Sequence, residues 1–215
     1  MENLNFYNFI ESSFFEDKEI VDNLESSPQK KINSKHLYDE NGSKLFEMIT
    51  NLDDYYPTRS ELEILDQKNV FKKNLPEKAS VIEFGSGSNK KVRKLLEALS
   101  NPKEYIPIDI SYELLKTNAK ELAKKFPKIK VKAVCADFNK LGSLQNIIEH
   151  KSKNLGFFPG STIGNFCPDD AKKLLKKFAK ILGKNNYLVI GIDIRKDKKI
   201  MEKAYNDSEG ITAEF

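Results

Sequence analysis

The sequence predicts an α/β protein whose core is a Rossmann-like, doubly wound parallel sheet preceded by a helical cap. Two observations carry this prediction. From Ser80 onward, short apolar runs alternate with amphipathic helical stretches, which is typical of repeated βα units. Before residue 78, apolar residues recur at helical spacing. We therefore expect residues 1–77 to form a helical region that contributes to a substrate site, and residues 78–215 to form the core.

The helical region is predicted from two short patterns. Residues 43–49 have apolar side chains at helical spacing. Thr58 followed by Glu61 resembles a capping box, in which two side chains satisfy the free backbone N–H groups at the start of a helix. We expect a second helix to begin there.

The core is predicted to alternate strands with helices. Ligands of doubly wound sheets bind beyond the carboxyl ends of the strands, so the residues that follow the strands are the first candidates for a site. The predicted strands are residues 80–84, 104–109, 131–137, 154–160 and 186–193, and the predicted helices are residues 91–99, 112–125 and 169–182.

Composition narrows the class of protein. Hydrophobic residues make up 39% of the chain and charged residues 32%. No apolar run approaches the roughly 20 residues that span a bilayer. The N-terminus lacks the cationic start and apolar core of a signal peptide. We expect a cytoplasmic protein with no membrane partner.

Cysteine and arginine usage argues against metal, disulfide and nucleic-acid chemistry. Cys135 and Cys167 lie outside any CxxC or Cys/His cluster, so we expect neither a disulfide scaffold nor a metal site. The net charge of +4 comes mostly from lysines on helical faces, whereas arginine is preferred for recognition of phosphates and bases. We expect no nucleic-acid partner.

A small glycine-bearing turn follows the first predicted strand. Gly85 and Gly87 permit a tight turn and let a ligand approach the backbone closely. Lys90 stands where a dinucleotide fingerprint needs a third small residue, and the lysine-hydroxyl ending of a P-loop is absent. The turn therefore favours a ligand with a nucleoside but no phosphates.

Two carboxylates close the next predicted strands. Asp109 ends the second strand, where a carboxylate can accept hydrogen bonds from ribose hydroxyls. Asp137 ends the third strand and Phe138 follows it, so a carboxylate could meet an adenine amino group while an aromatic ring covers the base. The alternative is that each aspartate only caps the helix after it.

Four sequence blocks resemble, in order, the signatures of histidine-specific methyltransferases of ergothioneine biosynthesis that depend on S-adenosylmethionine (SAM). The resemblance runs from Lys35 to Phe215 without a large gap. It implies a class I methyltransferase fold and an enzyme that transfers three methyl groups in turn from SAM to the α-amine of L-histidine, giving hercynine. The blocks are residues 36–46 (HLYDENGSKLF), 55–59 (YYPTR), 83–88 (EFGSGS) and 160–166 (GSTIGNF).

The resemblance also implies roles for single residues. Tyr38 and Asn165 would be catalytic, and Tyr55, Tyr56 and Asn165 would contact the histidine. From the residues alone, Tyr55 could simply pack in a turn, and Asn165 could hold a left-handed turn beside Gly164. The residues that would hold the methyl donor are Glu83, Gly85, Gly87, Lys91, Asp109, Asp137 and Phe138.

The resemblance implies that the proteins of this family continue beyond the point that corresponds to Phe215. The resemblance therefore implies a sheet that is incomplete at its C-terminal end. It also implies that contacts to the imidazole come from a C-terminal segment or a second chain outside this sequence. Two alternatives stay open, namely a methyltransferase for another small amine and a catalytically inactive module that binds SAM.

Overall fold

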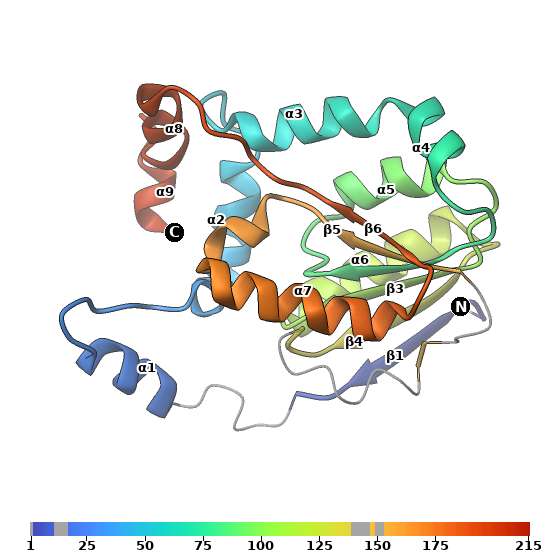
Figure 1. Ribbon diagram of the computed structural model, residues 1–215, viewed down its shortest axis with the longest axis horizontal. Helices are drawn as coiled ribbons and strands as arrows, with labels where there is room; N and C mark the ends of the chain where they lie inside the picture. The colour runs from blue at the N-terminus through green and yellow to red at the C-terminus, as the bar shows by residue number, and fades with distance from the viewer. Residues whose placement is uncertain (1, 11–16, 139–146, 149–152) are drawn as a thin grey trace.

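The computed structural model describes residues 2–10, 17–138, 147–148 and 153–215 (Figure 1). Within these residues, six strands form one sheet in the order β1-β4-β3-β2-β5-β6, and every pairing is parallel. The chain moves outward from β2 in both directions, so the sheet is doubly wound, as predicted. The strands are β1 (Leu4–Asn8), β2 (Ser80–Phe84), β3 (Glu104–Asp109), β4 (Lys130–Cys135), β5 (Asn154–Phe158) and β6 (Tyr187–Ile190).

Helices cover both faces of the sheet. Val81 and its neighbours pack against α5 (Asn89–Ala98) and α6 (Tyr112–Lys125). Ile82 and its neighbours pack against α7 (Pro168–Leu182) on the other face. Both apolar layers are buried, as expected of a parallel sheet whose crossover helices lie on its two faces.

The other helical elements are α1 (Asp17–Glu25), the 3-10 helix η1 (Ser34–Leu37), α2 (Glu40–Ile49), α3 (Tyr56–Leu65), α4 (Lys68–Asn74), the 3-10 helix η3 (Thr162–Asn165), α8 (Lys198–Tyr205) and α9 (Ile211–Glu214). A smaller apolar cluster includes Ile49 of α2, Tyr55 and Ala204 of α8. Figure 1 shows α8 and α9 beside α2, so the end of the described chain packs against the N-terminal helices.

The strands and helices predicted for the core are all present, with small shifts at their ends. The predicted strands that close at residues 137, 160 and 193 leave the sheet earlier, at Cys135, Phe158 and Ile190. Beyond these points the chain forms the loops at the carboxyl edge.

The N-terminal region is not wholly helical, which corrects the prediction for residues 1–77. β1 pairs in parallel with β4 at the edge of the sheet. Asn3 fixes its start, because the side-chain amide donates to the carbonyls of Ala123 and Ile129 at 3.0 Å each. A five-residue strand without a single buried side chain carries too little apolar patterning to be recognised in the sequence.

The capping box predicted at Thr58 is absent. α3 begins at Tyr56 with Pro57 in its first turn, and Thr58 is a buried residue inside the helix. Proline suits the first turn because its φ is already helical and its missing N–H is not needed there. Glu61 therefore does not cap the helix, and its side chain contacts other elements instead.

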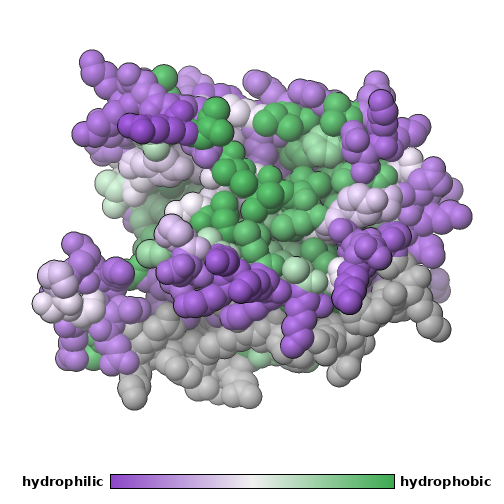
Figure 2. Space-filling model, viewed as in Figure 1, coloured by the Kyte–Doolittle hydropathy of each residue, from purple (hydrophilic) through white to green (hydrophobic). Residues whose placement is uncertain are grey.

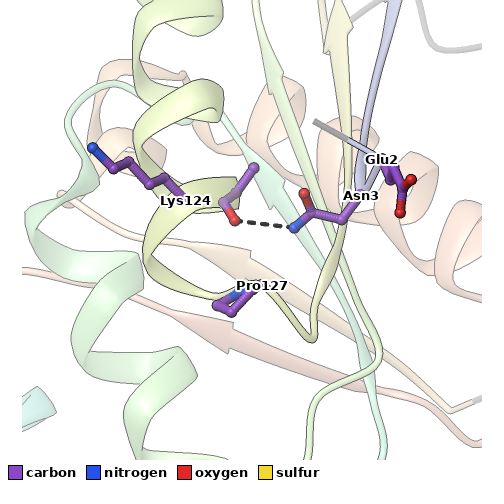
Figure 3. A pocket seen from close by; sticks show the side chains of 5 residues that line it. Glu2, Asn3, Lys124 and Pro127 are labelled. Atoms are coloured by element: carbon purple, nitrogen blue, oxygen red, sulfur yellow. Dashed lines mark hydrogen bonds between the residues drawn. The ribbon is translucent and has the colours of Figure 1, made fainter.

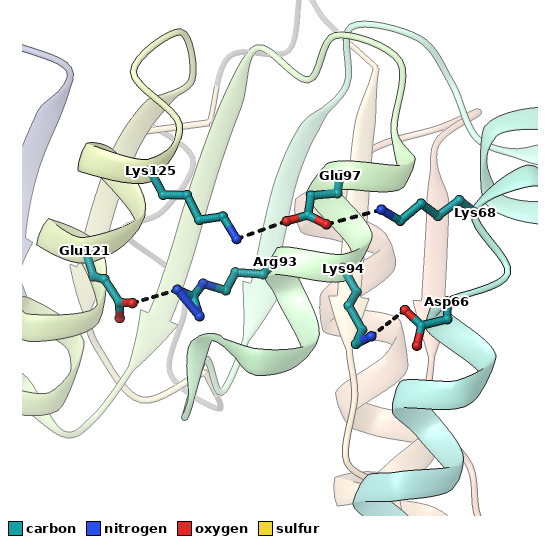
Figure 4. A network of polar contacts seen from close by, with 7 residues as sticks. All are labelled: Asp66, Lys68, Arg93, Lys94, Glu97, Glu121 and Lys125. Atoms are coloured by element: carbon teal, nitrogen blue, oxygen red, sulfur yellow. Dashed lines mark hydrogen bonds and ion pairs between the residues drawn. The ribbon is translucent and has the colours of Figure 1, made fainter.

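Ion pairs join the helices around α5 (Figure 4). Glu97 of α5 lies 3.2 Å from Lys68 of α4 and 3.0 Å from Lys125 of α6. Arg93 of α5 pairs with Glu121 of α6 at 2.7 Å. These side chains are partly exposed, so each pair contributes at most about 1 kcal/mol to stability.

β6 forms one edge of the sheet, and within the described residues its outer side has no strand beside it. Figure 2 shows an apolar area over this side of the molecule. Ile192 and Ile194, in the segment after β6, are exposed. In the part of the chain that the structure describes, no helix is long and apolar enough to cross a membrane.

Candidate functional site

The loop after β2 leaves space at the carboxyl edge of the sheet. Gly85 and Gly87 have positive φ angles of 75° and 39°, which residues with a Cβ rarely adopt. The N–H groups of Gly85 and Ser86 donate to the carbonyl of Ile108 on β3 at 2.9 and 3.1 Å. A Cβ on Gly87 would meet nothing within 4 Å, so a ligand can approach the backbone there.

Asp109, the last residue of β3, holds this loop. Its carboxylate accepts hydrogen bonds from the backbone N–H of Gly87 at 3.0 Å and of Ser111 at 2.9 Å. Burial raises the pKa of Asp109 above its usual value, and the backbone N–H donors oppose the rise. Asn118 of α6 also fixes the loop, because its side-chain amide donates to the carbonyl of Gly87 at 2.6 Å. Sequence reasoning found Asp109 but missed Asn118.

Glu83 lies inside β2, directly before the loop. Its side chain is 1% exposed and accepts a hydrogen bond from the hydroxyl of Tyr105 on β3. Burial raises the pKa of Glu83 well above its usual value, and the hydrogen bond from Tyr105 opposes this. The charges of Asp109 and Glu61 also raise this pKa, and that of Lys91 lowers it.

Phe138 and Ser86 border the same space. A Cβ on Gly85 would lie 3.4 Å from the ring of Phe138, and Asp137 is buried directly before that ring. The hydroxyl of Ser86 is buried and has no hydrogen-bond partner among the described residues, so a polar group of a ligand would satisfy it. The open space, this hydroxyl and the nearby carboxylates fit a nucleoside-bearing ligand such as SAM.

Aromatic side chains from separate segments pack together close to this loop. Tyr38, after η1, has its ring centroid 5.4 Å from that of Phe46 on α2 and 5.3 Å from that of Phe215. Tyr55 lies 6.1 Å from Phe46 and 5.9 Å from Tyr205 of α8. We call these five residues the aromatic cluster. Tyr38 and Tyr55 were predicted site residues, whereas no sequence pattern pointed to Tyr205 or Phe215.

Burial keeps the tyrosines of the aromatic cluster protonated. It raises the pKa of Tyr38 to about 12, and the negative charge of Asp109 adds to the rise. Burial likewise raises the pKa of Tyr55. Both hydroxyls are therefore neutral hydrogen-bonding groups at physiological pH. The aromatic cluster and the glycine loop are close together, because Lys90 Nζ, in the first turn of the helix after the loop, donates to the side chain of Asn51 at 3.0 Å and lies 3.8 Å from Glu47 of α2.

Tyr56 has a different set of partners. Its hydroxyl donates to Asp193, which also pairs with Lys196, and the ammonium of Lys196 lies 4.6 Å from the centroid of the Tyr56 ring. The N–H of Asp193 donates to the hydroxyl of Ser161 at 2.9 Å. These contacts connect the start of α3 to the turn that leads to Asn165, which is exposed at the end of η3.

A shielded ion pair also reaches this turn. Lys91 Nζ lies 2.6 Å from a carboxylate oxygen of Glu61, and both side chains are 16% exposed. The same carboxylate accepts the N–H of Gly160, at 2.9 Å to each oxygen. The predicted donor residue Lys91 therefore pairs with Glu61, which sequence reasoning had assigned to a helix cap.

An open depression lies at the opposite edge of the sheet (Figure 3). Because β1 is parallel to β4, the residues before β1 lie at the amino edge, whereas ligands of doubly wound sheets bind at the carboxyl edge. We therefore place the candidate site at the loop after β2. The depression is lined by Glu2, Asn3, Ala123, Lys124 and Pro127.

Comparison with known proteins identifies the family. A family model described as a histidine-specific, SAM-dependent methyltransferase matches residues 16–215. The chain belongs to this family. It is 32% identical over 201 residues to the histidine N-alpha-methyltransferase of Mycobacterium tuberculosis, covering 92% of this chain and 61% of that protein. It is 35% identical over 190 residues to the enzyme of the same name from Mycolicibacterium smegmatis, covering 86% and 58%.

These relatives are longer than the chain, which spans 61% and 58% of their lengths. The chain shares its fold with distant methyltransferases. The chain aligns with magnesium protoporphyrin IX methyltransferase from Synechocystis PCC 6803 with a TM-score of 0.53 and 12% identity, covering 83% of this chain and 87% of that protein. This likeness confirms the predicted class I methyltransferase fold.

Proposed function

We propose that this family member binds SAM at the loop after β2 and transfers its methyl group to the α-amine of L-histidine, in successive steps that end at hercynine. The observation that carries the proposal is the juxtaposition of the glycine loop and the aromatic cluster, because Lys90, at the start of α5 directly after the loop, contacts Asn51 and Glu47 at the end of α2, the helix that carries Phe46. Family membership supports the choice of histidine, since both mycobacterial relatives are named histidine N-alpha-methyltransferases.

The donor side would be formed at the carboxyl ends of β2, β3 and β4. When bound, SAM supplies an electrophilic methyl group on a sulfonium. Asp109 would accept hydrogen bonds from the ribose, and Asp137 with Phe138 would hold the adenine. The full set of residues on this side is Glu83, Gly85, Gly87, Lys91, Asp109, Asp137 and Phe138.

The acceptor side would be formed by Tyr38, Tyr55, Tyr56 and Asn165. The amine must be neutral to react, and a pocket walled by aromatic rings lowers the pKa of an amine by removing water from its charged form. The neutral hydroxyls of Tyr38 and Tyr55 would orient the amino acid. Positioning dominates such a reaction, because proximity and orientation supply roughly 7–11 kcal/mol.

Titration calorimetry tests the donor side. S-adenosylhomocysteine, the demethylated donor, should bind the chain, and histidine should then bind the saturated complex. In Asp109→Asn the amide nitrogen cannot accept a hydrogen bond. We expect S-adenosylhomocysteine to bind about 10- to 100-fold more weakly, because hydrogen bonds to a charged group contribute roughly 1.5–3 kcal/mol. Asp66→Asn, at the partly exposed ion pair with Lys94 in Figure 4, is the matched control and should bind like the wild type.

Three other outcomes contradict part of the proposal. If the wild-type chain does not bind S-adenosylhomocysteine, the donor site is wrong. If labelled methyl groups are transferred to another small amine but not to histidine, the chain is a methyltransferase of different specificity. If the demethylated donor binds but no amine is methylated, the chain is an inactive SAM-binding module.

A further inference from the structure

We propose that Glu61 is a positioning residue that holds the turn of residues 160–165 against α5 and so keeps the acceptor side of the site in place relative to the donor side. The inference rests on the proposed function, because it assigns Glu61 a task within that site. Glu61 is not one of the residues that sequence reasoning placed on either side.

The Glu61 carboxylate lies where several elements meet. It extends from α3, pairs with Lys91 of α5 and accepts the N–H of Gly160, which follows β5. A Cβ on Gly191, the residue after β6, would lie 2.1 Å from a carboxylate oxygen of Glu61. The carboxylate is therefore packed between α3, α5 and the carboxyl ends of β5 and β6.

These contacts require a carboxylate rather than another polar group. Both oxygens of Glu61 accept hydrogen bonds from the Gly160 N–H, and one also meets the ammonium of Lys91. An amide has one acceptor and one donor at these positions, so its NH₂ group would face another donor. The negative charge also strengthens each hydrogen bond that it accepts.

The turn that Glu61 holds needs such support. Gly160 and Ser161 have positive φ angles of 80° and 55°. A serine in this region is strained and persists only where surrounding contacts hold it. The turn leads into η3, which ends at Asn165, and α3 begins directly after Tyr55. One carboxylate thus links the two segments that carry predicted acceptor residues.

The contact also engages the ammonium of Lys91. Replacing Glu61 by a neutral residue would release the turn and, at the same time, free this ammonium for the carboxylate at the amino-acid end of the donor. The affinities for donor and acceptor should therefore change differently. A general loosening of the fold would weaken both.

Glu61→Gln in the full 215-residue chain tests the inference, with Glu63→Gln, at an exposed position of the same helix, as the matched control. Calorimetry measures S-adenosylhomocysteine first and histidine on the saturated complex second. In Glu61→Gln we expect histidine to bind at least about tenfold more weakly, as loss of a charge-assisted hydrogen bond implies. S-adenosylhomocysteine should bind as well as in the wild type or better. A fall of both affinities by the same factor overturns the inference.

Hydrogen exchange of the ligand-free chain separates this inference from the proposed function. The Gly160 amide should exchange about tenfold faster in Glu61→Gln than in the wild type or Glu63→Gln, because local opening is no longer opposed by the carboxylate. Unchanged exchange at Gly160 overturns the inference even if both ligands bind. If the wild-type chain binds no S-adenosylhomocysteine, the proposed function fails and the exchange result still decides the role of Glu61.

A second variant covers the case in which Glu61→Gln does not fold. Glu61→Asp keeps the charge but shortens the side chain, so it should show faster Gly160 exchange and weaker histidine binding, both to a smaller degree. Wild-type behaviour of Glu61→Asp in both measurements overturns the inference, because the geometry of the carboxylate would then not matter.

Discussion

Glu83 places an ionisable group inside the sheet, two residues before Gly85. The residue is 1% exposed, and its carboxyl accepts a hydrogen bond from the hydroxyl of Tyr105. Burial disfavours the charged form more strongly than this hydrogen bond favours it, so the pKa of Glu83 is well above its usual value of 4.5. The folded chain therefore holds the Glu83 proton more tightly than the unfolded chain does.

The stability of the protein should depend on pH through this residue. A raised pKa in the folded state stabilises the fold fully below the unfolded value of 4.5, and this contribution is lost as the pH rises through the folded value. Glu83→Gln keeps an acceptor for Tyr105 but cannot ionise. We expect the free energy of unfolding of the wild type to fall relative to that of the variant as the pH rises above 4.5. Urea denaturation over a pH series measures this, and parallel curves would contradict it.

A buried ion pair connects β3 and β4 near their amino ends. Lys132 Nζ lies 2.8 Å from Glu104, and the two residues are 5% and 7% exposed. Lys132 also donates to the carbonyl of Ile147 at 3.2 Å, and the hydroxyl of Ser80 on β2 donates to Glu104 at 3.3 Å. This polar group therefore joins three neighbouring strands at the edge opposite the candidate site.

Removing one partner of this ion pair should lower the free energy of unfolding more than replacing both partners by apolar residues. Lys132→Met leaves the Glu104 carboxylate buried without its cation, and we expect a loss of about 3–5 kcal/mol in the free energy of unfolding. The double variant Lys132→Met, Glu104→Leu should recover most of that loss, because apolar residues of similar volume are often neutral replacements. Urea denaturation compares the three proteins. If single and double variants are equally unstable, the unpaired charge is not the cause.

The two edges of the sheet differ. β1 covers β4 on one side and lies before residue 16, where the match to the family model begins. β6 has no further strand on its outer side within the described residues. Unpaired edges of parallel sheets expose backbone donors and acceptors, and within the described residues β1 and β6 are the two strands with such an edge.

At the scale of the whole molecule, the proposed donor site lies where the loop is hydrogen-bonded to the central strands β2 and β3, so a ligand bound there should stabilise the entire fold. At about 100 times its dissociation constant, S-adenosylhomocysteine should add roughly 2.7 kcal/mol, which corresponds to a rise in Tm of about 5–10 °C for a domain of this size. Thermal unfolding with and without the ligand measures this. Asp109→Asn should show a smaller rise at the same ligand concentration, and an equal rise would place the ligand elsewhere.

The sequence by itself determined the parallel α/β core and brought together most of the residues proposed for the donor side. Strand runs such as residues 80–84 and the glycine turn after them are recognisable because each depends on residues close together in the chain. The meeting of Gly85, Asp109 and Phe138 was predictable for a related reason. Parallel strands end at one edge, so residues at successive strand ends come together whatever the side chains between them.

Only the tertiary structure decided the partners of residues far apart in the chain. The pattern at Thr58 and Glu61 suits a helix cap, yet Pro57 starts the helix earlier and Glu61 binds Gly160, 99 residues away. The places of Tyr205 and Phe215 in the aromatic cluster depend equally on how α8 and α9 fold back on α2. Tertiary packing determines which groups a carboxylate or an aromatic ring contacts. Residues close in the sequence therefore do not predict these contacts.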